Sequence, residues 1–329
     1  MSGVSFLLVL PAIMLFMVFV DMTSTGIEGN SRVIQSSYVL NDAKDLEENI
    51  EITGKQVFKS EAENVVKTGI PLSNSRQSIK ENMQIKMNQI TQEVKDNNGI
   101  EEECNITSVS SSEDPFAVEV NSSIKVRKDD VTHQEHISQD ITILDPQYPT
   151  PNPLPFIKCH NYGGVQLANS RISFGYSLSK YLESRGVENA AAYENATTPL
   201  IIKKCPYDPY IMHGRKEFKT LKNCIENGYF HESSDGSCFL CRLEGKGTCP
   251  HYGMETYIIP SPLTNISSNS TNLTFNTAPS SIDHVIFNDT PPGSGTYPGK
   301  KIIYLSEGGN LLILYLDNAH RQKYGFPLA

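Results

Sequence analysis

Residues 233–251 read SSDGSCFLCRLEGKGTCPH and combine turn-forming residues with three cysteines and a histidine. Gly, Ser and Asp favour turns, so regular secondary structure alone does not hold this stretch in one shape. It needs cross-links or a bound metal ion, and the fold of the surrounding region depends on which of the two is present. A CxxC turn followed by a third thiol and an imidazole offers four ligands to one tetrahedral zinc ion. These ligands are Cys238, Cys241, Cys249 and His251.

The cysteine count supports a competing interpretation, a set of disulfides. Of the 7 cysteines, only Cys104 precedes residue 157. An even number of cysteines in an extracellular domain most simply forms disulfides, each worth roughly 2–4 kcal/mol. We prefer this pairing, keep structural zinc as the alternative, and expect Cys104 to stay out of it. The pairing set is Cys159, Cys205, Cys224, Cys238, Cys241 and Cys249, and Cys205 or Cys224 could also replace His251 in the zinc set.

Length and net charge limit the number of domains and the kinds of partner that we expect. The chain has 329 residues, enough for two folded units, and a net charge of −9. The acidic excess lies in residues 1–156, and neither half has the positive field that nucleic-acid binding requires. We therefore expect no nucleic-acid partner.

The N-terminal residues 1–20 read MSGVSFLLVLPAIMLFMVFV and contain no charged side chain. About 20 apolar residues are enough to cross a bilayer as a helix. This stretch predicts a transmembrane anchor that ends at Asp21, a single-pass protein at the cell membrane, and an extracellular location for the rest of the chain. A cleaved signal peptide and a buried helix of a soluble protein are the alternatives.

A resemblance to a known family lies in the same stretch. The segment Gly3-Val4-Ser5-Phe6-Leu7-Leu8-Val9-Leu10-Pro11, followed by an apolar run, is similar to the start of TadE-like minor pilins, with Ser5 where the family usually has Glu. The resemblance implies a pilin-like subunit that is held in a membrane by its first helix. It also implies other pilin-like subunits as partners.

Asn-x-Ser/Thr sequons fit an extracellular glycoprotein. Three of them cluster in NISSNSTNLT, a polar stretch that is typical of an exposed loop. An unmodified polar loop is the alternative interpretation. The predicted acceptors are Asn105, Asn121, Asn195, Asn265, Asn269, Asn272 and Asn288.

Residues 21–145 are expected to form a helical stalk with a small β-sheet, as in a pilin. Apolar residues recur at helical spacing over 29–67 and again over 75–98, where Ser78 and Glu81 have capping-box spacing. From residue 103 the pattern changes to alternation, which predicts antiparallel strands over 104–109, 116–126 and 137–144. This predicts a sheet against which the helices pack.

Five prolines in residues 145–155 predict an extended linker, and we place it at 146–156. Residues 157–329 are then a Cys-rich extracellular domain. It closes with two apolar runs around Gly308-Gly309, which predict a β-hairpin. The expected fold class is therefore α+β: an N-terminal transmembrane helix, a helical stalk with a small antiparallel sheet, and a Cys-rich mixed α/β domain that ends in a β-hairpin.

The sequence favours a non-enzymatic function. It contains no phosphate-binding or dinucleotide-binding motif, and we predict no catalytic residue. The preferred interpretation is a membrane-anchored extracellular structural or adhesion protein, with pilin-like subunits or cell-wall components as partners. The alternatives are an anchored hydrolase that acts on cell-wall polymers and a zinc-dependent binding module.

Overall fold

The computed structural model describes residues 4–187, 190–215, 218–260, 280–288, 302–307 and 310–328. The chain divides into two compact units. The first unit comprises Met1–Glu51, Gln84–Ile106 and Ser122–Ile137, and the second comprises Ile52–Met83, Thr107–Asn121 and Ser138–Ala329.

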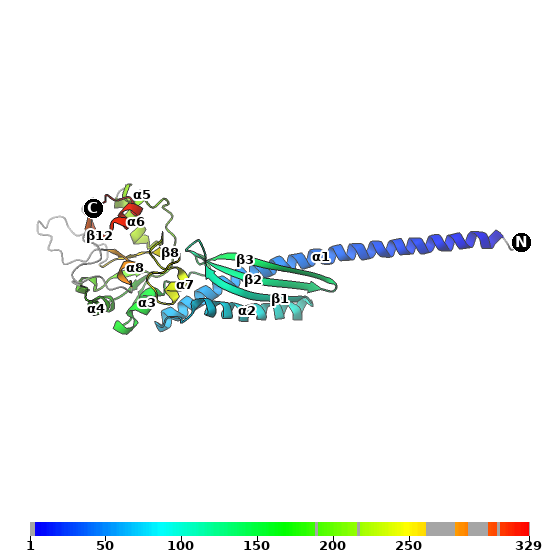
Figure 1. Cartoon of the computed structure of the whole chain (residues 1–329), viewed down its shortest axis with the longest axis horizontal. Helices are drawn as coiled ribbons and strands as arrows, with labels where there is room; N and C mark the ends of the chain where they lie inside the picture. Colours follow the sequence, from blue (N-terminus) through cyan, green and yellow to red (C-terminus); the bar gives the residue numbers. More distant parts are fainter. Residues whose placement is uncertain are drawn as a thin grey trace. The chain divides into compact units, whose positions relative to one another are not determined.

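The first helix, α1 (Val4–Thr68), is 65 residues long and continuous (Figure 1). It covers the helix predicted over 29–67 and ends where Gly69 adopts a φ of +67°. The Gly69 N–H donates to the Val65 carbonyl, which closes the last turn. A left-handed glycine at this position is a common helix terminator, so the predicted stop is confirmed.

The membrane anchor is corrected by the structure. Among the helices of the described residues, none is both long and apolar enough to cross a membrane. The transmembrane helix predicted over 1–20 is therefore wrong, and so is the single-pass location at the cell membrane that depended on it. The apolar residues do not form a separate element: α1 does not end at Asp21 but continues through the acidic segment that follows.

The second helix, α2 (Ser75–Asn98), has the predicted bounds. Its N-terminal cap differs from the prediction, because Asn74 and not Ser78 precedes the first turn. The Asn74 side-chain oxygen accepts a hydrogen bond from the Gln77 N–H at 3.1 Å, which satisfies a free N–H of the first turn. Gly99, with a φ of +65°, ends the helix.

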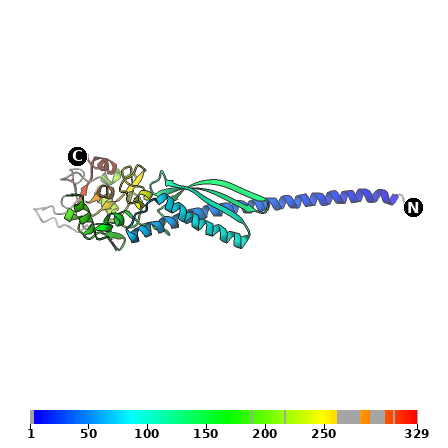
Figure 2. The ribbon, with the colours of Figure 1, turned by 60° about the horizontal axis from the view of Figure 1, so that its bottom comes forward.

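Three strands follow in a sheet of order β1-β2-β3: β1 (Glu101–Ser111), β2 (Ala117–Lys128) and β3 (Val131–Thr142) (Figure 2). On β2 buried and less buried residues alternate, as expected for a strand with one face packed. In the first unit, α2 contacts β1 through Gln84, whose amide donates to the Cys104 carbonyl and accepts from the Ile106 N–H, both at 2.7 Å. The predicted strands and their packing against a helix are confirmed.

The proline-rich segment packs against the second unit. Residues 150–156 are buried, Pro151 pairs with Ile201, and the Asn152 N–H donates to the Leu200 carbonyl at 2.7 Å. The segment leads directly into α3, which begins at Leu154. Whether residues 157–329 fold without residues 1–145 stays a prediction.

The Cys-rich region is built from short elements. Its helices are α3 (Leu154–Cys159), α4 (Ser177–Ser184), α5 (Met212–Arg215), α6 (Phe218–Asn227), α7 (Phe239–Leu243), α8 (Asp283–Ile286) and α9 (Asn318–Tyr324), with single turns η1 (His160–Tyr162) and η2 (Ala190–Tyr193). Its strands are β4 (Gln166–Ala168), β5 (Arg171–Ser173), β6 (Thr197–Pro199), β7 (His231–Ser233), β8 (Gly253–Glu255), β9 (Tyr257–Ile258), β10 (Ser281–Ile282), β11 (Ile302–Glu307) and β12 (Asn310–Tyr315). Strands β11 and β12 pair antiparallel, which confirms the predicted hairpin. The α+β class with small antiparallel sheets is also confirmed.

Glu102 on β1 gives the first unit a pH-dependent stability. Burial, followed by the nearby carboxylates of Asp42 and Asp45, raises the pKa of Glu102 to about 7 from 4.5. Between these two values the folded chain holds a proton that the unfolded chain has released. The free energy of unfolding therefore falls as the pH rises through this window.

We expect Glu102→Gln to raise the free energy of unfolding by about 1 kcal/mol at pH 8, because the side chain is only half-buried, and to have little effect at pH 4.5. Urea unfolding followed by circular dichroism at both pH values measures this. The matched control is Glu103→Gln, since the Glu103 side chain is exposed and pairs with Lys125 at 3.0 Å. A Glu102→Gln effect that is equal at both pH values would contradict the assignment.

Candidate metal centres

Two groups of cysteine and histidine side chains meet inside the second unit. Within each group the potential ligand atoms all lie within 4.8 Å of one another. The first cluster consists of Cys205, His213, Cys224 and His231, and the second cluster consists of Cys238, Cys241, Cys249 and His251.

The potential ligands of the first cluster come from four separate segments. Cys205 follows β6, and its N–H donates to the Phe230 carbonyl at 2.8 Å. His213 lies on α5, Cys224 lies on α6, and His231 begins β7. All four side chains are buried. The cluster therefore brings together short segments that few regular secondary-structure contacts connect.

The spacing of the first cluster matches a tetrahedral zinc site. The sulfurs of Cys205 and Cys224 lie 3.6 Å apart, and the Nε2 atoms of His213 and His231 lie 3.3 Å apart. A tetrahedron with Zn–S bonds of about 2.3 Å and Zn–N bonds of about 2.05 Å has edges of about 3.8 Å and 3.3 Å. Of the four mixed S···N edges, the one from Cys205 to His213 is 3.5 Å, close to the expected length of about 3.6 Å, and the one from Cys224 to His231 is shorter, at 3.0 Å.

The tautomer of His213 directs a lone pair at the cluster. Its Nδ1 lies 2.7 Å from the Tyr210 carbonyl oxygen, which only accepts hydrogen bonds. Nδ1 therefore carries the proton, and Nε2 is free to bind a metal. A histidine ligand that donates its other N–H to a carbonyl is the usual outer-shell arrangement of a metal site.

The two thiols of the first cluster differ in acidity. A hydrogen bond from Cys224 lowers the pKa of Cys205, while burial raises the pKa of Cys224. Burial also lowers the pKa of His231, so this imidazole is neutral. Metal ligation needs thiolates and neutral imidazoles, so the Cys224 proton must leave when the ion binds.

The second cluster is local in sequence. Cys238 is the N-cap residue of α7, Cys241 lies within that helix, and Cys249 and His251 follow in the next loop. His251 Nδ1 lies 3.8 Å from the Cys238 sulfur and 3.6 Å from the Cys241 sulfur. Both distances are close to a tetrahedral S···N edge of about 3.6 Å.

A backbone N–H and a hydroxyl group contact the sulfurs of the second cluster. The Cys238 N–H donates to the Cys249 sulfur at 3.3 Å, and the Ser111 hydroxyl lies 3.4 Å from the Cys238 sulfur. Hydrogen bonds, first from Cys241 and then from Cys249, lower the pKa of Cys238. Cys238 therefore favours the thiolate, the form that binds zinc. Hydrogen bonding to Cys238 raises the pKa of Cys241 and of Cys249, so these two thiols lose their protons only when a metal ion binds.

The cysteines form no disulfide. All seven are described by the structure and all are free thiols. The sulfurs of Cys205 and Cys224, at 3.6 Å, are far beyond the bond length of about 2.05 Å. The preferred prediction of three disulfides is not supported. The cysteine sulfurs are therefore available as ligands for zinc, the alternative. Cys104 is unpaired, as predicted, and lies buried.

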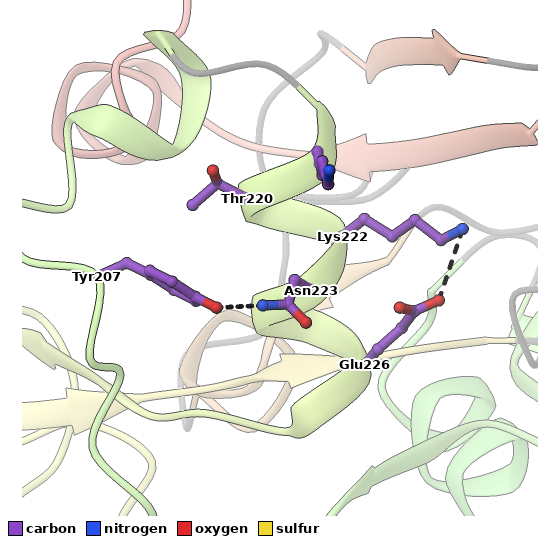
Figure 3. Close-up of a pocket in the computed structure, with 6 residues that line it drawn as sticks. Tyr207, Thr220, Lys222, Asn223 and Glu226 are labelled. Atoms are coloured by element: carbon purple, nitrogen blue, oxygen red, sulfur yellow. Dashed lines mark hydrogen bonds and ion pairs between the residues drawn. The ribbon is translucent and has the colours of Figure 1, made fainter.

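A polar cavity lies beside the first cluster and is lined largely by α6 (Figure 3). Its volume is about 470 Å³. Asn223 donates to the Tyr207 hydroxyl, and Lys222 pairs with Glu226 at 3.7 Å. The backbone N–H of Tyr207 in turn donates to the Cys205 sulfur at 3.4 Å, so the wall of the cavity is tied to the cluster.

The sequons that the structure describes lie at or near the surface. Asn105 and Asn195 are exposed, and Asn121 and Asn288 are partly exposed. The predicted acceptors Asn265, Asn269 and Asn272 lie outside the described residues. Glycosylation stays a prediction.

The second cluster is the predicted zinc set, brought together as the CxxC spacing indicated. The first cluster was missed as a site. The sequence predicted Cys205 and Cys224 as metal ligands only in place of His251, and it did not predict His213 and His231 as ligands. The signal that could have found it is the pairing of each cysteine with a following histidine: Cys205 with His213, and Cys224 with His231.

Comparisons with family models, with curated proteins and with solved structures found no match to this chain. The resemblance of residues 3–11 to TadE-like pilins therefore stays a prediction, and the metal clusters stand on their geometry.

We expect each cluster to bind one ion through thiolates. Co²⁺ bound to thiolates absorbs in the near ultraviolet by charge transfer, so both Cys224→Ser and Cys241→Ser should lose one equivalent of Co²⁺ and part of this absorption. Titration followed by absorbance and elemental analysis measures both. Cys104→Ala is the control, because burial raises the pKa of Cys104 to about 12 and no cluster contains it. Full cobalt binding by both serine variants would refute the two centres.

Proposed function

We propose that the chain is a zinc-dependent binding module, in which zinc ions at the two clusters hold the Cys-rich region in its folded shape. The observation that carries the proposal is the first cluster: four buried ligands whose S···S and N···N distances match the edges of a zinc tetrahedron. Structural zinc sites use four protein ligands of this kind and have no open position.

The donor chemistry supports zinc over other ions. Thiolates and imidazoles select zinc and related soft or borderline metals, whereas Ca²⁺ and Mg²⁺ prefer oxygen ligands. Zinc also does not undergo redox chemistry, which suits a centre that holds a fold together.

The short elements explain why a metal is needed. Outside the β11–β12 hairpin, the strands of the Cys-rich region are two or three residues long, and its longest helix, α6, has 10 residues. Such elements gain little stability from their own hydrogen bonds. Metal binding to a site that is absent in the unfolded chain adds directly to folding stability.

The first cluster also fixes a surface that can bind a partner. Cys224 anchors the buried face of α6, while Lys219 and Lys222 on the same helix line the polar cavity. Loss of the ion would free α6 and deform this cavity. This links zinc binding to recognition in the proposed module.

Removal of zinc should unfold the Cys-rich region. We expect a strong chelator to lower the melting temperature of the full chain by about 10 °C or more, because several kcal/mol of metal binding are lost and each shifts the midpoint by about 2–4 °C. Added Zn²⁺ should restore it and Mg²⁺ should not. The double variant Cys224→Ser/Cys241→Ser serves as the control that zinc cannot rescue. An unchanged melting temperature after complete zinc removal would sink the proposal.

A pilin-like structural subunit is the second candidate. Its support is the element order, a long N-terminal helix followed by an antiparallel sheet, which is what the TadE-like resemblance implies. In addition, Ile34 and Tyr38 lie four residues apart on α1 and are each 53% exposed. Apolar residues at this spacing share one face of a helix and could contact another copy of the chain.

Sedimentation of the full chain tests this candidate. A structural subunit should self-associate, and Ile34→Glu should weaken that association because it places a charge in the contact. Ile70→Glu is the control, since Ile70 is 62% exposed but lies beyond the end of α1. A monomer at all concentrations, or equal effects of both variants, would argue against it.

A further inference from the structure

A third cluster of potential ligands contains no cysteine. Glu255 ends β8, His284 lies on α8, and His320 lies on α9. All three side chains are buried, and their ligand atoms lie within 4.8 Å of one another. The Glu255 Oε2 atom is 3.2 Å from His320 Nε2 and 3.6 Å from His284 Nδ1. Two imidazoles thus converge on a single carboxylate oxygen.

Outer groups hold Glu255 and His320 in place. The other carboxylate oxygen, Oε1, accepts hydrogen bonds from Lys323 at 2.8 Å and from the Tyr324 hydroxyl, which leaves Oε2 for the cluster. His320 Nδ1 lies 2.9 Å from Asp317 Oδ1, so the aspartate accepts its N–H and Nε2 points at Oε2. Carboxylate–histidine pairs of this kind orient ligands around metal ions.

A buried ring nitrogen of His284 that makes no hydrogen bond independently indicates a ligand at this cluster. Its side chain is only 3% exposed, and its Nδ1 atom makes no hydrogen bond. The nearest oxygen in the cluster, Glu255 Oε2, is too far away at 3.6 Å. A buried polar atom without a partner is costly, and a cation between the three side chains would satisfy it.

A cavity of about 420 Å³ reaches this cluster. Glu255, His320 and Lys323 line it, whereas His284 does not. The cavity wall also includes Tyr210, Glu232 and Tyr252. Three protein ligands beside a cavity leave room for a water molecule or another small ligand, which distinguishes this cluster from the closed four-ligand clusters.

We propose that Glu255, His284 and His320 bind a divalent transition-metal ion, with an open coordination position that faces the cavity. Two imidazoles and one carboxylate suit zinc and its neighbours in the first transition row. The absence of thiolates from this cluster predicts spectroscopic and exchange properties unlike those of the two cysteine clusters. The ion would be exchangeable and accessible to a small ligand, a role that structural zinc does not have.

A Co²⁺ titration of the full wild-type chain tests the proposal without any substitution. The thiolate charge-transfer absorption should saturate when the two cysteine clusters are filled, while the visible cobalt absorption and the bound metal should rise by one further equivalent. Azide, a small ligand that enters open positions, should alter only the spectrum of this last equivalent. Binding that stops when the thiolate absorption saturates would overturn the proposal.

Substitution then assigns the third equivalent. His284→Phe keeps a ring of similar size but removes the ligand atom, so it should lose the third equivalent and retain the full thiolate absorption. Tyr252→Phe, on the cavity wall, is the matched control and should bind as the wild type does. If His284→Phe binds as much metal as the wild type, the assignment is wrong. If thiolate absorption is absent but one equivalent still depends on His284, the two-zinc proposal fails and this inference stands.

Discussion

The buried ion pair between Arg242 and Asp283 holds the Cys-rich region together. The two side chains are 0% and 1% exposed and approach to 2.7 Å. Desolvation makes such a pair expensive, so it is tolerated only when the remaining hydrogen-bonding groups are satisfied. Arg242 meets this condition by also donating to the Ser237 and Met254 carbonyls and to the Asn152 side chain. Loss of either charge would leave the other buried and unpaired, at a cost of about 3–5 kcal/mol.

This ion pair also connects the second and third candidate clusters. Arg242 directly follows Cys241 of the second cluster, and Asp283 directly precedes His284 of the third. Asp283 accepts from the backbone N–H of His284 at 2.8 Å and from that of Thr256 at 3.1 Å, next to Glu255. One buried contact therefore positions the side chains of Cys241, Glu255 and His284, which come from separate parts of the sequence.

Elements with a local signal were predictable from the sequence, and those that depend on distant contacts were not. The apolar spacing over 75–98 gave α2, and the alternation after residue 103 gave the β1–β3 sheet, because both patterns involve neighbours in the chain. Charge at Asp21 was expected to end the first helix, but the helix continues through it. The proline content predicted a linker at 146–156, whereas residues 150–156 are buried. They contact residues about fifty positions later in the chain, and local composition does not predict such distant contacts.

The cysteines show why counting them was misleading. The region after residue 157 contains six cysteines, and this even number suggested three disulfides. The structure sorts the same six into a pair in the first cluster, a trio in the second, and Cys159 alone and buried. A group of three cysteines and a single cysteine are both odd in number, so neither can pair completely within itself. Each group that contains more than one thiol also contains enough histidine to complete four ligands. Disulfides would use the sulfurs and leave His213 and His231 buried without a role, whereas zinc uses every member of both clusters.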